Sequence, residues 1–267
     1  MNINFTSRLA VRTMAVTACL MTLLNTPAHG QDDVADVPSE KHELKDAPLE
    51  YHVIGGGGES SPAKGYKVLI VLPGGDGSAE FLPFVKRIYK HALSDEYLVI
   101  QLIAHSWRRN QQIVWPTKKN GVPGMKLSTE EFLAAAVGEV GEGVKIDKRH
   151  VYALAWSSGG PAVYAASLDQ DTPLTGAFVA MSVFNPRFLP PLEAAKGRAY
   201  YLWHSPDDRI CPYHMAQDAE KQLRENGADV KLETYDGGHG WRGNVFGSLR
   251  DGVSWLEEQT PPQREEK

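Results

Sequence analysis

The stretch RHVYALAWSSGGPAVYAA, residues 149–166, constrains the fold of this chain more than any other part of the sequence. Residues 151–155 form an apolar run that is typical of a strand buried on both faces. Residues 162–166 then place small apolar side chains at helical spacing. Because so few residues separate the strand from the helix, the chain must turn sharply at Ser157. Large side chains two residues before or after that turn would collide.

Ala155 and Gly159 meet this steric requirement on either side of Ser157. The helix that begins behind the serine points its free N–H groups, and the positive end of its dipole, at whatever the serine attacks. The pattern therefore predicts a nucleophile elbow, G-x-S-x-G, with alanine in place of the first glycine. The alternative is an ordinary strand-to-helix turn rich in serine and glycine.

Strand-like and helix-like patterns alternate along the rest of the chain. This alternation predicts an α/β fold, a doubly wound and mostly parallel sheet with helices on both faces. A further strand at 49–54, followed by the glycine-rich loop 55–65, suggests a hairpin with the next strand. We expect the remaining strands at 66–72, 97–103, 151–155, 176–181, 199–204 and 230–235, and helices at 80–93, 128–141, 212–226 and 246–259.

The first thirty residues have the pattern of a secretory signal peptide. Two arginines precede an apolar run at 14–24, and small residues follow at 27–30. The sequence VTAC ending at Cys19 also resembles a lipoprotein box, but the apolar run continues past it, whereas a lipid anchor is normally followed by polar residues. We expect an exported protein, periplasmic or extracellular, without stable insertion in a membrane.

The mature chain is expected to be one domain with short polar ends. Residues 31–47 are acidic, contain proline and have no period, so they are predicted to be a flexible leader. Residues 48–260 are long enough for one sizeable core, and 261–267 form a polar tail. Cleavage after Gly30 removes two arginines and no acids, which takes the net charge from −5 to −7. No basic tract remains, so nucleic acid is not an expected partner.

Residues that can do chemistry follow three of the predicted strands. Ser157 follows the strand at 151–155, Asp207 and Asp208 follow the one at 199–204, and His239 follows the one at 230–235. In a parallel sheet, the loops after the carboxyl ends of the strands form the site. Serine is a poor nucleophile without a base, and that base needs an acid to orient it. The order Ser, Asp, His along the chain is that of the α/β-hydrolases.

From about residue 49 to 258, the chain resembles the α/β-hydrolases of the esterase, acyl-hydrolase and polyhydroxybutyrate-depolymerase-like group. The segment HSPDDRICP at 204–212 resembles the H-G-x-x-D-x-x-V-P segment of that group, with serine for the glycine and cysteine for the valine. The segment IDKRHVY at 146–152 resembles its I-D-x-x-R-V-Y segment just before the elbow.

The resemblance implies that residues 48–260 are an α/β-hydrolase catalytic domain. In this alignment Asp208 is the triad acid, with Asp207 as the alternative. Ser157 is then the nucleophile and His239 the base. The protein is expected to be a secreted serine hydrolase that cleaves carboxylic esters, of small molecules or polymers, through an acyl-enzyme intermediate. No cofactor is expected, and the sequence makes no prediction of oligomeric state.

The oxyanion hole is also implied by the resemblance. The segment Pro-Gly-Gly at 73–75 occupies the place of the H-G-x loop of the group, with proline for histidine. We expect the Gly75 N–H to be one donor to the oxyanion. The Ser158 N–H is the expected second donor, because Ser158 directly follows the nucleophile.

Two segments can shape the cleft. Residues 182–198 contain an Asn-Pro-Arg and a Pro-Pro sequence, which leave no room for a large cap domain. Residues 104–127 are long and irregular, so they are the better candidate for shaping the mouth of the cleft. We expect an open cleft that takes short acyl chains or small polar esters. Four aromatic residues are candidates for its walls, although core packing explains them equally well: Trp107, Trp115, Trp156 and Trp241.

A metal site is not expected. After signal cleavage Cys211 is the single cysteine, which excludes an internal disulfide and a cysteine-based zinc site. His204 and His214 could suggest a metal together with His239. In the family pattern, however, His204 is a structural residue at a strand end, and His239 already has a role.

Two other functions remain open at this point. A peptidase of the prolyl-oligopeptidase type shares the fold and the order of the triad, but such enzymes usually carry a propeller domain, for which this chain has neither length nor repeats. A non-catalytic binding protein on the same scaffold would have no need to keep all three triad residues.

Overall fold

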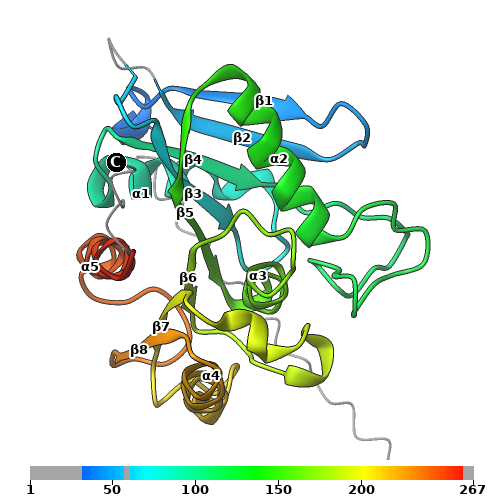
Figure 1. Cartoon of the computed structure of the whole chain (residues 1–267), viewed down its shortest axis with the longest axis vertical. Coiled ribbons are helices and arrows are strands. Elements are labelled where there is room, and N and C mark those ends of the chain that lie inside the picture. The colour runs from blue at the N-terminus through cyan, green and yellow to red at the C-terminus, as the bar shows by residue number, and fades with distance from the viewer. Residues whose placement is uncertain (1–31, 57–60, 261–267) are drawn as a thin grey trace, which may run out of the picture.

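The computed structural model describes residues 32–56 and 61–260 (Figure 1). The expected signal peptide at 1–30 and the polar tail at 261–267 lie outside the described residues. Within the described part of the chain, no helix combines the length and the apolar composition that a bilayer crossing requires.

The core of the fold is one eight-stranded sheet with the order β1-β2-β4-β3-β5-β6-β7-β8. The strands β3 to β8 run parallel to one another, whereas β2 is antiparallel to both β1 and β4. The doubly wound, mostly parallel sheet predicted from the sequence is therefore confirmed. The strand bounds are β1 Ser39–Glu43, β2 Glu50–Gly55, β3 Tyr66–Leu72, β4 Tyr97–Leu102, β5 Ile146–Trp156, β6 Gly176–Ala180, β7 Ala199–His204 and β8 Asp229–Thr234.

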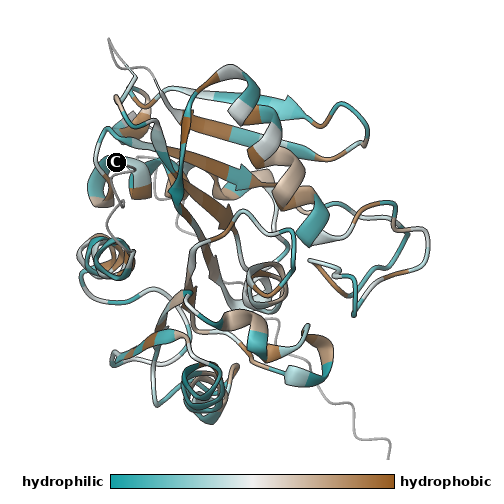
Figure 2. Cartoon of the chain, in the orientation of Figure 1, coloured by the Kyte–Doolittle hydropathy of each residue, from teal (hydrophilic) through white to brown (hydrophobic). Residues whose placement is uncertain are grey.

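Helices cover both faces of the sheet. The helices α1 and α5 pack on one face, and α2, α3 and α4 pack on the other (Figure 1). The central strands are mostly apolar, because both of their faces are covered (Figure 2). Gln101 in β4 is a buried polar exception. The helices run over α1 Leu82–Ala92, α2 Thr129–Gly143, α3 Gly160–Ser167, α4 Tyr213–Glu225 and α5 Val245–Gln259.

The prediction of a flexible leader at 31–47 is wrong for the residues that the structure describes. A short helical turn at Asp32–Val34 is followed by β1, which pairs with β2 along its length. Val34 and Val37 are 2% and 5% exposed and pack into the core on the side of α1. The folded domain therefore begins some fifteen residues before the predicted boundary at 48.

The acidic composition that suggested disorder in this segment has a structural use. Asp33 pairs with Arg87 at 2.8 Å, and Asp36 pairs with Lys90 at 2.8 Å. Both basic residues lie on α1, more than fifty residues further along the chain. The acids therefore hold the segment against α1, a contact that a local sequence pattern cannot reveal.

The predicted hairpin between residues 49–54 and the next strand is also wrong. β2 lies between β1 and β4, with Tyr51 opposite Leu102, and makes no ladder with β3. In the sheet, β4 separates β2 from β3, although β3 follows β2 in sequence.

No cap domain covers the described part of the fold. The segment after β6 contains only two single turns of 3-10 helix, at Pro186–Phe188 and Leu192–Ala195. The segment between β4 and α2 contains no regular element. The carboxyl ends of the central strands are therefore flanked by two loops rather than by a separate layer.

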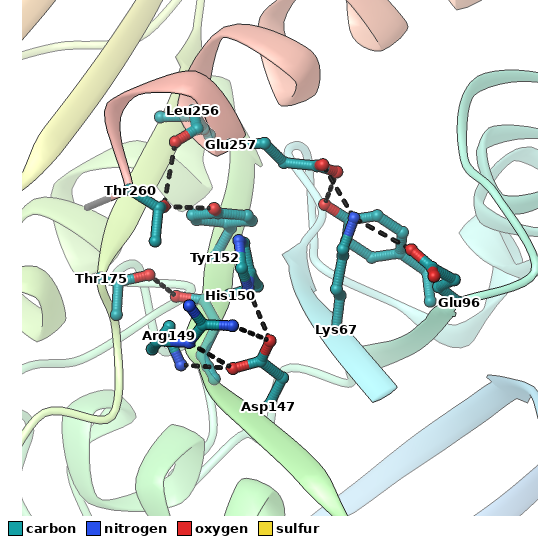
Figure 3. A network of polar contacts seen from close by, with 12 residues as sticks. Lys67, Glu96, Asp147, Arg149, His150, Tyr152, Thr175, Leu256, Glu257 and Thr260 are labelled. Atoms are coloured by element: carbon teal, nitrogen blue, oxygen red, sulfur yellow. Dashed lines mark hydrogen bonds and ion pairs between the residues drawn. The ribbon is translucent and has the colours of Figure 1, made fainter. Parts of the chain in front are cut away.

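A network of polar contacts fastens the last helix at the opposite end of the sheet (Figure 3). The Lys67 ammonium lies 2.8 Å from a Glu257 carboxylate oxygen and 3.1 Å from one of Glu96. The Tyr97 hydroxyl donates to the other Glu257 oxygen at 2.6 Å. Burial opposes the charge of Lys67, but the two carboxylates outweigh it and raise its pKa. Because these residues lie at the amino ends of β3 and β4, the network anchors α5 well away from Ser157.

Candidate active site

Ser157 occupies a strained turn directly after β5. Its φ of 51° lies in the left-handed region, which residues other than glycine rarely adopt. A Cβ atom at Gly159 would lie 2.4 Å from the Leu72 carbonyl oxygen and 3.2 Å from the Ala155 Cβ. The alanine at the first small position therefore fits, while the second position requires glycine.

The backbone of the turn is also held from the side. The Ser182 hydroxyl, at the end of β6, donates to the Ser157 carbonyl at 2.6 Å. A Cβ at Gly160 would lie 2.1 Å from that hydroxyl oxygen, so glycine is needed for the two segments to approach. The contact with Ser182 thus helps to hold Ser157 in its strained conformation.

Ser157, His239 and Asp208 lie in a chain of hydrogen bonds. The His239 Nε2 is 3.1 Å from the Ser157 Oγ, and the His239 Nδ1 is 2.8 Å from an Asp208 carboxylate oxygen. The three side chains come from the loops after β5, β8 and β7. Because Nδ1 faces a carboxylate, it carries the ring proton, which leaves Nε2 free to accept the proton of the serine.

The Asp208 carboxylate is fully buried and well supplied with donors. One oxygen accepts from the backbone N–H groups of Ile210 and Cys211, both at 2.8 Å, and the other faces His239. Burial by itself would raise the pKa of Asp208, but the Cys211 N–H, the His239 ring and the Ile210 N–H together lower it below its usual range. The group is therefore a carboxylate at neutral pH.

His204 makes a contact that the sequence did not predict. Its Nε2 lies 2.8 Å from the Cys211 carbonyl oxygen and 3.3 Å from the Asp208 oxygen that also faces His239. Burial lowers the pKa of His204, so the ring is neutral and a single N–H at Nε2 points to both acceptors. Because His204 lies four residues before Asp208 in the segment HSPDDRICP, the sequence offered a sign that the two side chains could meet.

Asp207 lies differently from its neighbour. Its side chain is exposed, whereas that of Asp208 is buried against His239. Its backbone N–H donates to the Ser205 hydroxyl oxygen at 3.2 Å, and the Gly238 N–H donates to the same oxygen at 3.1 Å. Ser205, the residue in place of the family glycine, therefore ties the loop of the acid to the loop of the base.

The loop at 73–75, which is the expected oxyanion loop, lies against the elbow. The Ser158 hydroxyl donates to the Gly75 carbonyl at 2.9 Å, which joins the two segments directly. Gly75 has a φ of 62°, and among the described residues its N–H has no hydrogen-bond partner. The Trp115 indole N–H donates to the Pro73 carbonyl at 3.0 Å and so fixes the loop from behind.

The four tryptophans do not form one wall. Trp156 is 6% exposed and packs edge-on against Trp241, which in turn stacks on Trp203. Trp115 is 4% exposed and lies between the loop at 73–75 and a cavity beside Ser158. Trp107 does not line that cavity.

The cavity beside Ser158 has a volume of about 330 Å³. Its walls come from the segment after β4, from the beginning of the elbow helix and from the segment after β6. The first of these segments lies within residues 104–127, which the sequence predicted to shape the mouth of the cleft. A larger cavity of about 790 Å³ lies between the end of α2 and the amino end of β5, at the opposite end of that strand from Ser157.

One group of described residues could offer three ligand atoms to a metal: Asp208, Cys211 and His239. Burial raises the pKa of the Cys211 thiol to about 11, so it is protonated at neutral pH. A metal here would have to displace that proton and break the bond between His239 and Asp208. The donor chemistry therefore does not favour a resident ion.

Comparison with known proteins gives matches in structure alone. No protein-family model matches the chain, and no curated protein matches it in sequence. A carboxylesterase of Bacillus cereus superposes with a TM-score of 0.57 at 16% identity, over 84% of this chain and 95% of that one. A thermostable esterase from Pseudomonas putida gives 0.64 at 14% identity, over 86% of each chain. An acylaminoacyl peptidase of Pyrococcus horikoshii gives 0.61 at 14% identity, over 86% of this chain and 43% of that one.

Proposed function

We propose that this chain, which has the α/β-hydrolase fold, is an exported serine hydrolase that cleaves carboxylic esters. The observation that carries the proposal is the hydrogen-bond chain from Ser157 through His239 to Asp208, at a strained strand-to-helix turn. The esterases that share the fold support the choice of reaction. Export rests on the pattern of residues 1–30.

The first half of the reaction forms an acyl-enzyme. The His239 Nε2 takes the proton from the Ser157 Oγ as that oxygen attacks the ester carbonyl carbon. The carbonyl oxygen becomes an oxyanion and accepts from the N–H groups of Gly75 and Ser158. When the tetrahedral intermediate collapses, the proton on Nε2 passes to the leaving alcohol.

The second half releases the acid. Water takes the place of the alcohol, gives a proton to the His239 Nε2 and attacks the acyl carbon. The Asp208 carboxylate stabilises the imidazolium in both halves and holds the ring in the required tautomer. When the second tetrahedral intermediate collapses, its bond to the Ser157 Oγ breaks, the carboxylic acid leaves and the proton on the His239 Nε2 returns to that oxygen. Ser157 and His239 are thus regenerated, and none of these steps needs a cofactor.

Fluorophosphonate labelling tests whether the serine is activated. The purified protein should become covalently labelled at Ser157 and should hydrolyse p-nitrophenyl acetate. Prior labelling should abolish the hydrolysis, and boiled protein should not label. Absence of both labelling and turnover would favour the non-catalytic binding protein.

The peptidase alternative is favoured by one finding, the likeness to an acylaminoacyl peptidase, less than half of which this chain covers. A matched pair of substrates separates the two activities. p-Nitrophenyl acetate and p-nitroacetanilide present the same acyl group as an ester and as an amide. We expect turnover of the ester alone, and comparable turnover of both would favour the peptidase.

The absence of a cap in the described fold leads to a kinetic prediction. An open cleft needs no lipid surface to uncover it, so the initial rate should not rise when a substrate passes its solubility limit. Short acyl chains should be preferred over long ones. Initial rates of p-nitrophenyl butyrate and p-nitrophenyl laurate, measured across their solubility limits, check both points. A sharp rise at the emulsion boundary with preference for laurate would contradict the open cleft.

A further inference from the structure

We propose that the cavity of about 330 Å³ beside Ser158 is the acyl-binding subsite, and that it takes a bulky but compact, mostly apolar acyl group. This inference rests on the proposed ester hydrolysis and assigns the acyl half of the substrate to this cavity.

The positions of the reacting groups decide which half of the ester faces the cavity. The leaving oxygen must lie against the His239 Nε2, because that nitrogen gives it a proton. The alcohol therefore departs on the side of His239. The cavity is lined by Ser158 and Pro161 of the elbow, and by no residue of the loops that carry His239 and Asp208. It lies on the side of the oxyanion donors, where the acyl group remains attached to Ser157.

The lining of the cavity is mostly apolar. Val114 and Trp115 come from the segment after β4, and Val183 and Leu189 come from the segment after β6. Trp115 also holds the loop at 73–75 through the Pro73 carbonyl, so the same side chain contacts both the cavity and that loop. Binding of an apolar group here is favoured because it removes apolar surface from water.

Phe188 adds an apolar edge at the mouth. Its side chain is 44% exposed, and within the described residues it is one of two large hydrophobic side chains left exposed to this degree. Its ring contributes to the lining of the cavity. A bound acyl group would cover the ring, which would offset the cost of leaving it in water.

The size and the polar residues of the cavity limit the length of the acyl group. A volume of about 330 Å³ is at the lower end of the roughly 300–1,000 Å³ typical of small-molecule pockets. Asn120 and Asn185 also line the cavity. A long alkyl chain that fills the cavity would lie against these amides, whereas a compact ring or a branched group can stay on the apolar lining residues. The favoured class is therefore esters of ring-bearing or branched short acids.

Two substrate series test which half of the ester binds in the cavity and which class of acyl group it prefers. The first keeps p-nitrophenol as the alcohol and varies the acyl group through acetyl, benzoyl and octanoyl. The second keeps acetyl and varies the alcohol through p-nitrophenol and 2-naphthol. We expect the wild-type protein to favour benzoyl over octanoyl esters in kcat/KM.

Val183→Phe should fill the cavity. We expect it to lower kcat/KM for the benzoyl ester by at least about tenfold, the scale on which pocket volume discriminates substrates. The acetyl esters should lose much less than the benzoyl ester, with either alcohol. Val122→Phe is the matched control and should keep the wild-type rates with all esters, because Val122 lies in the same irregular segment as Val114 but does not line the cavity. Phe188→Ala, at an exposed position, should raise KM for the benzoyl ester more than it raises KM for the acetyl ester.

The outcomes separate this inference from the proposed function. Labelling and acetyl turnover in the wild type report on the hydrolase itself, whatever the cavity does. If the loss of kcat/KM in Val183→Phe depended on the alcohol rather than on the acyl group, the assignment of the cavity to the acyl half of the ester would be overturned. An equal loss with all esters, or the same loss in Val122→Phe, would overturn the cavity as a subsite.

Discussion

Replacing Ser157 with alanine should lower turnover by about six orders of magnitude, the scale seen when a triad serine is removed. The variant loses the only oxygen that lies 3.1 Å from the His239 Nε2. Folding should survive, since alanine is smaller than serine and the strained φ is imposed by the surrounding segments. Residual hydrolysis of p-nitrophenyl acetate, measured beside the thermal unfolding midpoint, checks both statements.

Ser158→Ala is the matched control for this variant. It removes the hydroxyl that donates to the Gly75 carbonyl but keeps the backbone N–H that we propose as an oxyanion donor. We expect a smaller loss than in Ser157→Ala, because only the support of the loop is weakened. If Ser158→Ala were inactive while Ser157→Ala kept its activity, the register of the elbow would be wrong.

Replacing Asp208 with asparagine should lower kcat by about four orders of magnitude. The asparagine amide can turn an N–H toward the His239 Nδ1, which then carries no proton, and Nε2 can no longer accept the proton of the serine. The loss should appear in kcat, with little change in KM, because the carboxylate does not face the substrate. Steady-state kinetics on a short-chain ester measures both constants.

Asp207→Asn is the matched control, since it makes the same change one residue earlier on an exposed side chain. It should leave kcat close to that of the wild type. A larger loss in Asp207→Asn than in Asp208→Asn would move the acid to Asp207 and would mean that the loop after β7 is arranged differently.

The parallel sheet could be predicted because its strands carry their own signal. A strand buried on both faces is a nearly continuous apolar run. The strand β6 is wholly apolar, β3 is apolar apart from Lys67, and β4 is apolar apart from Gln101. The elbow could be predicted for a similar reason. The turn requires small residues within a few positions of Ser157, so this requirement can be recognised from the local sequence.

The edge of the sheet could not be predicted in the same way. β1 is exposed at four of its five residues, and the segment before it is held by ion pairs with α1. β2 pairs with β4, which lies beyond β3 in sequence. These pairings depend on residues that are distant in sequence. The local pattern of charge and proline therefore predicted disorder where the structure has a paired strand.

In the site too, some features follow from the local sequence and others depend on tertiary packing. The order of the triad and its place after three strands followed from the sequence, whereas the contact of His204 with Asp208 depends on how the loop after β7 folds back. The cavity likewise needs two segments that are about seventy residues apart in sequence to face each other. Residues 104–127 were expected to shape the mouth of the cleft, but nothing in the sequence indicated that they face residues 182–198.

The charged strand β1 also has a consequence for the solubility of the domain. It ends the sheet with Glu40, Lys41, His42 and Glu43 exposed, and charges at an edge discourage pairing with another chain. A protein shortened to begin at residue 48 would uncover the longer and more apolar β2, including Tyr51. Its unpaired N–H and C=O groups would then offer a template for strand addition. The first folded residues therefore protect the domain from self-association, although they lie far from any chemistry.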